Sequence, residues 1–110
     1  MIRAQVFEIV APDATTRIAR FLIEGHAGSG EYGRDVVCAA VSALAINFVN
    51  SVEALCGHEL WHEARNGYLD VRVTEDEPTQ WLAKSLRVGL VGMAKEHARY
   101  LRVQENTVTM

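Results

Sequence analysis

Apolar and polar residues alternate over several short stretches of the chain, and this period of two predicts strands. Residues 2–10 and 15–24 are rich in strand-forming side chains, and the Pro12-Asp13 turn signal between them predicts a hairpin. Residues 58–65 and 68–74 predict a second hairpin, because Asn66-Gly67 between them is the strongest short hairpin signal. A last short strand is expected at about 99–105.

Two longer stretches follow the helical period instead. Asp35 opens a pattern that runs to about Leu55, and Gly57 suits the end of a helix. The apolar stripe expected to face the core comprises Val37, Val41, Leu44, Phe48, Val52 and Leu55. A second helix is predicted to begin at Glu75-Asp76-Glu77-Pro78, since acidic residues and proline favour a first turn. Its expected core face comprises Leu82, Leu86, Gly89, Leu90, Met93 and His97.

The order of these elements, ββα-ββα-β, predicts an α+β fold. We expect one two-layer domain over residues 1–110, in which two helices cover a mostly antiparallel sheet. The length of 110 residues is typical of one domain. Hydrophobic residues make up 49% and charged residues 23% of the chain, which is ordinary globular usage and argues against disorder.

Charge and cysteine content narrow the possible partners and the compartment. The net charge of -3 and a pI near 5.8 leave no broad basic face, so we expect no direct nucleic-acid binding. We find no signal peptide and no run of about 18 uninterrupted apolar residues, so no membrane contact is expected. Cys38 and Cys56, if both lie on one helix, are separated by about 27 Å, too far for a disulfide. A reducing cytoplasm fits these thiols best.

The candidate chemistry lies between the second strand and the first helix. His26 stands where the strand ends, and Cys38 follows twelve residues later in the expected first helical turn. If Asp35 caps this helix, the positive end of the helix dipole stabilises a Cys38 thiolate, and a nearby imidazole can accept the thiol proton. On a helical wheel Asp35, Cys38 and Ser42 lie within about 60° of one another and away from the core stripe.

Each of these residues also has an ordinary structural interpretation. A helical cysteine often packs as an inert hydrophobe, and Asp35 is a common type of helix cap. Ser42 is of a type that hydrogen-bonds the preceding turn, and His26 is a common kind of strand-end residue. The residues by themselves therefore leave the catalytic and the structural interpretation about equally supported.

The motif as a whole resembles the signature of the ribosomal-processing cysteine protease (Prp) family. The similar segments read Gly25-His26-Ala27-Gly28, then Glu31-Tyr32-Gly33, then Asp35-Val36-Val37-Cys38-Ala39-Ala40-Val41-Ser42-Ala43-Leu44. Members of that family remove a short N-terminal extension, ending in an apolar and aromatic segment, from one large-subunit ribosomal protein. The resemblance extends over essentially the whole chain.

The resemblance implies a role for each matching position. Cys38 would be the nucleophile and His26 its base, with Asp35, Ser42 and Gly25 supporting the site. A mobile loop over the substrate would comprise Gly28, Ser29, Gly30, Glu31, Tyr32, Gly33 and Arg34. It further implies a ribosomal protein precursor as partner, a homodimer, and no cofactor.

Other residues and other functions remain to be weighed. His58 and His62, if both lie in one strand, are about 13 Å apart with no third ligand nearby, so we expect no metal site. Trp61 and Trp81 are expected in the core or at an interface. Two alternative functions stay open: a non-catalytic peptide- or ribosome-associated binding module that uses the same cleft, and a redox-responsive thiol protein that uses Cys38.

Overall fold

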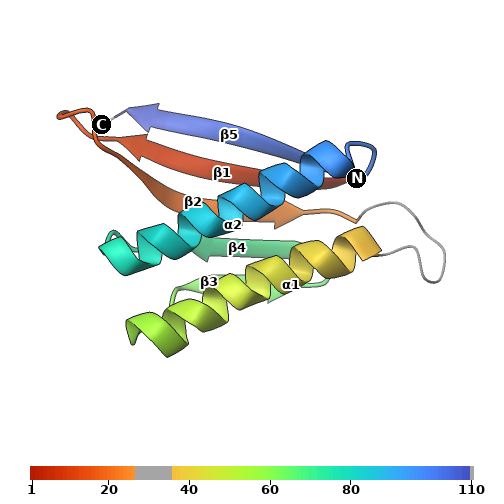
Figure 1. Ribbon diagram of the computed structural model, residues 1–110, viewed down its shortest axis with the longest axis horizontal. Coiled ribbons are helices and arrows are strands. Elements are labelled where there is room, and N and C mark those ends of the chain that lie inside the picture. The colour runs from red at the N-terminus through yellow and green to blue at the C-terminus, as the bar shows by residue number, and fades with distance from the viewer. Residues whose placement is uncertain (27–35, 110) are drawn as a thin grey trace.

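Five strands form one sheet, and two helices cover one of its faces (Figure 1). The computed structural model describes residues 1–26 and 36–109. The elements in chain order are β1 (Ile2–Val10), β2 (Thr16–Glu24), α1 (Val36–Ser51), η1 (Val52–Cys56), β3 (His62–Arg65), β4 (Tyr68–Arg72), α2 (Glu77–Glu96) and β5 (Leu101–Thr109). The strand order is β3-β4-β2-β1-β5, and every neighbouring pair is antiparallel except β1 with β5. The predicted two-layer α+β class is confirmed.

Both predicted hairpins are present, with one boundary to correct. Asn66-Gly67 forms the turn between β3 and β4, where Gly67 has a φ of +72° that favours glycine. The strand predicted at 58–65 is wrong in its first half, because β3 begins only at His62. Residues 58–61 are irregular instead, and the His58 side chain turns toward the start of α2, where Nε2 lies 3.2 Å from Thr79 Oγ1.

The first helix supplies most of one side of the core. Its buried residues are Val37, Val41, Ala45 and Phe48, followed by Val52 in η1. The Phe48 ring meets the Phe21 ring of β2 edge-to-face at a centroid distance of 5.5 Å. Leu55, predicted to be in the core, is 76% exposed. The reason is that η1 is a π-helical turn, whose i→i+5 hydrogen bonds place more residues in each turn and rotate Leu55 away from the sheet.

The second helix begins within its predicted first turn, at Glu77. The Asp76 carboxylate caps it by accepting the Thr79 N–H at 3.2 Å. Leu86 and Leu90 are buried as predicted, whereas the prediction for His97 is wrong. His97 is exposed, because the helix ends at Glu96 and His97 already has non-helical backbone angles as the C-cap.

Close packing of the two helices depends on Gly89. A Cβ added there would lie 3.2 Å from Leu44 Cδ1 of α1, a contact tighter than side chains normally make.

The final strand is longer than the predicted 99–105, since β5 runs along the full length of β1 in parallel.

The positions of the two tryptophans and of the long first helix also bear on the expectations from the sequence. Trp61 and Trp81 are 56% and 63% exposed, so neither belongs to the core, and an interface role for them stays a prediction. The continuous helix Val36–Cys56 is long and apolar enough, by length and composition alone, to cross a membrane. Its stripe of buried residues packs in the core of the domain, and the core helix of a compact domain meets the same criterion.

Candidate active site

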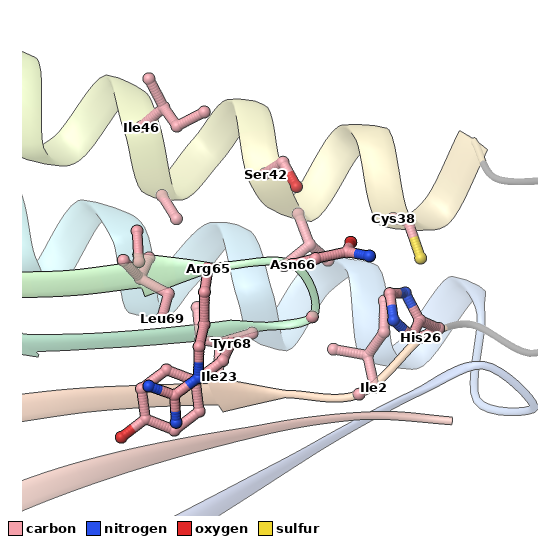
Figure 2. Close-up of a pocket in the computed structure, with 15 residues that line it drawn as sticks. Ile2, Ile23, His26, Cys38, Ser42, Ile46, Arg65, Asn66, Tyr68 and Leu69 are labelled. Carbon is pink, nitrogen blue, oxygen red and sulfur yellow. The ribbon is translucent and has the colours of Figure 1, made fainter.

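Cys38 lies in the first turn of α1, on the flank of the buried stripe. The preceding residue, Val37, is buried in the core, whereas Cys38 is half-buried. Figure 2 shows the sulfur of Cys38 pointing from the helix toward the imidazole of His26. The helical wheel placed Cys38 off the core stripe, and the position of its sulfur agrees with that placement.

His26 is the second residue after the end of β2 and is exposed. Its neighbour Gly25 has a φ of +94°, and a Cβ there would collide with the carbonyl oxygen of Met1. The Gly25 N–H donates to the carbonyl of Gly67 in the β3–β4 turn at 2.9 Å. A glycine at position 25 therefore lets the chain leave the sheet tightly, and its hydrogen bond holds the residue before His26 against the hairpin.

Gly67 also touches the imidazole itself. A Cβ built on Gly67 would lie 2.7 Å from His26 Nε2 and 3.0 Å from Cε1. A side chain at position 67 would therefore displace the ring from its present position. Gly67 thus leaves space for the imidazole, and the hydrogen bond from Gly25 ties the backbone before His26 to the hairpin turn.

The two candidate catalytic side chains share one pocket of about 290 Å³. It lies between the first turns of α1, the end of β2 and the β3–β4 hairpin (Figure 2). Apolar side chains that line it are Ile2, Ile23, Val41, Ala45, Ile46 and Leu69. Ser42 and Asn66 add polar groups near Cys38. The pocket can therefore receive an apolar group beside a thiol and an imidazole.

The predicted site residues can now be placed. Gly25, His26, Cys38 and Ser42 all line this pocket, and Ser42 is exposed in it one turn after Cys38. Asp35 and the predicted loop Gly28–Arg34 lie outside the described residues. The catalytic and supporting roles of these residues stay predictions. The sequence predicted Asn66 and Gly67 only as turn residues, and their place in the pocket was missed. No local sequence signal could have shown it, because the turn meets His26 only in the folded sheet.

A charged cluster lies on the other side of the sheet. Asp70 alternates in β4 with Leu69 and Val71, so its side chain projects from the face opposite the helices. Its carboxylate accepts two hydrogen bonds from Arg20, at 2.8 and 2.9 Å, and these hold its pKa below the ordinary value. This ion pair stabilises the sheet and does not reach the pocket.

The two histidines considered as metal ligands do not meet. His58 contacts Thr79 and Asp76, whereas His62 Nδ1 donates to the Leu60 carbonyl at 2.9 Å. The expectation that both lie in one strand is wrong, because position 58 precedes β3. Within residues 1–26 and 36–109, no three His, Cys, Asp or Glu side chains converge as a metal site would require.

A cysteine at a helix start whose sulfur points to a histidine in an apolar pocket is the arrangement of a thiol hydrolase. The family model described as Cysteine protease Prp matches residues 1–102. A ribosomal processing cysteine protease Prp from Bacillus subtilis is 31% identical over 99 residues, which are 83% of this chain and 88% of the relative. The protein of that name from Staphylococcus aureus is 26% identical over 91 residues, 79% of this chain and 86% of the relative. The chain therefore belongs to the Prp family of cysteine proteases.

Solved structures agree with the fold. The crystal structure of SMU.848 from Streptococcus mutans is 32% identical, covers 98% of this chain and 96% of its own, and gives a TM-score of 0.79. Prp from S. aureus, crystallised with a covalently linked product peptide, gives a TM-score of 0.82 over 96% of this chain and 100% of its own. At 24% identity this second likeness shows the fold alone.

Proposed function

We propose that this protein is a cysteine endopeptidase that removes a short N-terminal extension from a large-subunit ribosomal protein precursor. In this proposal the whole chain, 1–110, forms one protease domain, with Cys38 as nucleophile and His26 as general base. The observation that carries the proposal is the sulfur of Cys38 pointing toward the His26 imidazole within one apolar pocket (Figure 2). The relatives named as ribosomal processing proteases supply the class of substrate.

The chemistry uses the Cys38 and His26 side chains and one water molecule. His26 accepts the thiol proton, and the Cys38 thiolate attacks the carbonyl carbon of the scissile bond. His26 then protonates the leaving amine, the C–N bond breaks, and the N-terminal fragment remains bound as a thioester. A water molecule activated by His26 hydrolyses that thioester and restores the thiol. Because thiolate and imidazole supply the nucleophile and the base, the reaction needs no cofactor.

The start of α1 suits the negative charge that forms during the attack. The first N–H groups of an α-helix lie outside its hydrogen-bond ladder and point out of the helix end. A tetrahedral oxyanion formed at Cys38 lies close to these groups and to the positive end of the helix dipole. Ser42, one turn further along the same face, is the nearest pocket hydroxyl on α1 that can orient the substrate.

The lining of the pocket fits an apolar substrate segment. Its side chains from Ile2, Ile23 and Leu69 come from three strands and leave an apolar floor beside Cys38. An extension that ends in apolar and aromatic residues buries them against this floor. Burial of each large apolar side chain contributes about 1.5–3 kcal/mol to binding before its costs.

The test is cleavage of the purified precursor from the same organism, followed by intact mass. Wild-type protein is expected to cut one bond, and Cys38→Ala to cut none. Cys56→Ala is the matched control, since this second thiol lies 18 residues further along the helix and outside the pocket, and it should cleave as the wild type does. Cleavage by Cys38→Ala, or no cleavage by the wild type, would contradict the proposal.

The base is tested in the same assay. His26→Ala is expected to lower kcat by about 10²–10⁴-fold, the usual range for loss of a general base. His97→Ala is the control, because His97 is an exposed histidine at the C-cap of α2 that does not line the pocket. Equal activity of both variants would remove His26 from the mechanism.

For assembly and location, we infer a homodimer in the cytoplasm. Val36 at the start of α1 and Leu55 in η1 are exposed by 61% and 76%, and residues 36–52 contain no charged side chain. An apolar surface of this kind favours contact with a second copy. The reducing cytoplasm keeps Cys38 as the thiol that the mechanism requires.

Sedimentation velocity tests the dimer. Wild-type protein is expected at about twice the chain mass of 12.2 kDa, and Leu55→Glu is expected to shift it toward one chain mass. Val88→Glu is the control, since Val88 is equally exposed on α2 at 72%. A monomeric wild type would contradict this inference and leave the protease proposal intact.

A further inference from the structure

The edge strand β3 borders the pocket and has an open side. It ends the strand order, so one of its sides pairs with β4, and no other strand of residues 1–26 or 36–109 pairs with it. Figure 1 shows α1 running over this edge of the sheet. Ala64 and Arg65 of β3 line the pocket, and Ser42 and Ile46 line it from α1. A groove that contains Cys38 is therefore bordered by a helix and by a strand edge.

The direction of the β3 peptide groups follows from the hairpin register. His62 pairs with Val71 and Glu63 pairs with Asp70. The Arg72 N–H donates to the Trp61 carbonyl at 3.0 Å, so the hydrogen-bonded positions in β3 are the odd-numbered ones. The N–H and C=O groups of His62 and Ala64 consequently point away from β4. Of these two residues, Ala64 lines the pocket.

We propose that the peptide substrate adds to β3 as a further strand, with its backbone paired to the outward N–H and C=O of Ala64. The proposal rests on the proteolytic function above and names how that site holds its substrate. An extended peptide satisfies the strand's outward backbone groups. It also directs every second side chain into the apolar pocket, and it leads the scissile bond along α1 to Cys38.

A proline in place of Ala64 tests the pairing. Ala64→Pro removes one outward N–H and none of the hydrogen bonds within the hairpin, and edge strands tolerate proline at such positions. We expect kcat/KM for a peptide of about twelve residues, centred on the bond cleaved in the precursor, to fall by about tenfold or more. Thr107→Pro is the matched control. The Ile2 N–H donates to the Tyr100 carbonyl, so even-numbered β5 residues face β1 and Thr107 points outward from an edge far from the pocket.

Methylated substrates give a second readout that needs no enzyme variant. With the wild type, N-methylation of single peptide amides should lower kcat/KM about fivefold to tenfold at alternate positions on one side of the scissile bond. This period of two is the signature of strand pairing. Cleavage of the peptide with no loss in Ala64→Pro and no alternating pattern would overturn the pairing while the protease function stands. No cleavage by the wild type would overturn both.

Discussion

The imidazole of His26 packs against the bare Cα of Gly67, where an added Cβ would lie 2.7 Å from Nε2. The same glycine accepts a hydrogen bond from the Gly25 N–H at 2.9 Å. The turn of the β3–β4 hairpin therefore fixes both the strand end that carries His26 and the space that its ring occupies. The orientation of the candidate base depends on a turn more than 40 residues away in sequence.

Gly67→Ala should impair catalysis beyond its effect on stability. The new methyl group displaces the imidazole from its position facing Cys38, so we expect kcat to fall by about tenfold or more while KM changes little. Because alanine is strained at a positive φ, the substitution should also lower the free energy of unfolding by about 1–2 kcal/mol. Steady-state kinetics on the precursor peptide and a thermal melt measure the two effects separately.

Gly57→Ala is the control for the backbone cost. Gly57 has a φ of +78°, close to the +72° of Gly67, but an added Cβ meets no atom within 4 Å. The Gly57→Ala variant should therefore lose as much stability as Gly67→Ala and keep the kcat of the wild type. If both variants lose kcat equally, the contact with His26 is not what matters at Gly67.

The Gln80 side chain hydrogen-bonds the backbone of β2 and of the residues that follow β4. Its buried side chain accepts the Ile18 N–H at 2.8 Å and donates to the Ile18 and Thr74 carbonyls at 2.7 and 2.9 Å. Gln80→Ala leaves these buried groups without a partner, so the free energy of unfolding should fall by about 3 kcal/mol. Gln104→Ala, at an exposed position on β5, should change it by less than about 0.5 kcal/mol. Urea denaturation measures both, and equal stabilities would contradict the role of Gln80.

The Arg20–Asp70 pair should make stability depend on pH in acid. The hydrogen bonds from Arg20 lower the folded-state pKa of Asp70 below its ordinary value of 3.8. A carboxyl with a lowered folded-state pKa stabilises the fold above the unfolded-state pKa and loses this effect as pH falls through the folded-state pKa.

Asp70→Asn should therefore lower the free energy of unfolding by about 2 kcal/mol at neutral pH. The difference from the wild type should shrink as the pH drops below about 4. Denaturant titrations across the acid range measure it. A difference that stays constant down to about pH 2 would show that charge at Asp70 is not the cause.

Much of the fold could be predicted from local patterns. The Asn66-Gly67 turn, the Asp76 cap and the Gly57 helix end follow from chemistry that acts within a few residues. Leu55 was misplaced because a helical wheel assumes 3.6 residues per turn, and the π-helical turn at 52–56 breaks that assumption. Strand pairing over long sequence distances, such as β1 with β5, has no comparable local signal.

In the candidate site, too, some residues could be predicted from the sequence and others could not. Cys38 at the start of a helix and His26 at the end of a strand could be selected from their positions and from the family resemblance. The contribution of Gly67 could not, because its contact with His26 joins segments that only the folded sheet brings together. The same holds for the outward peptide groups of Ala64, which depend on the register between β3 and β4.

The most direct test of the catalytic role of Cys38 is to trap the thioester intermediate. Wild-type protein mixed with the precursor peptide and quenched in acid within milliseconds to seconds should gain the mass of the N-terminal fragment minus one water, and digestion should place it on the peptide that contains Cys38. His26→Ala should form this adduct far more slowly. Cleavage that proceeds with no adduct at any quench time and persists in Cys38→Ala, or an adduct located on Cys56, would contradict the assignment of Cys38 as nucleophile.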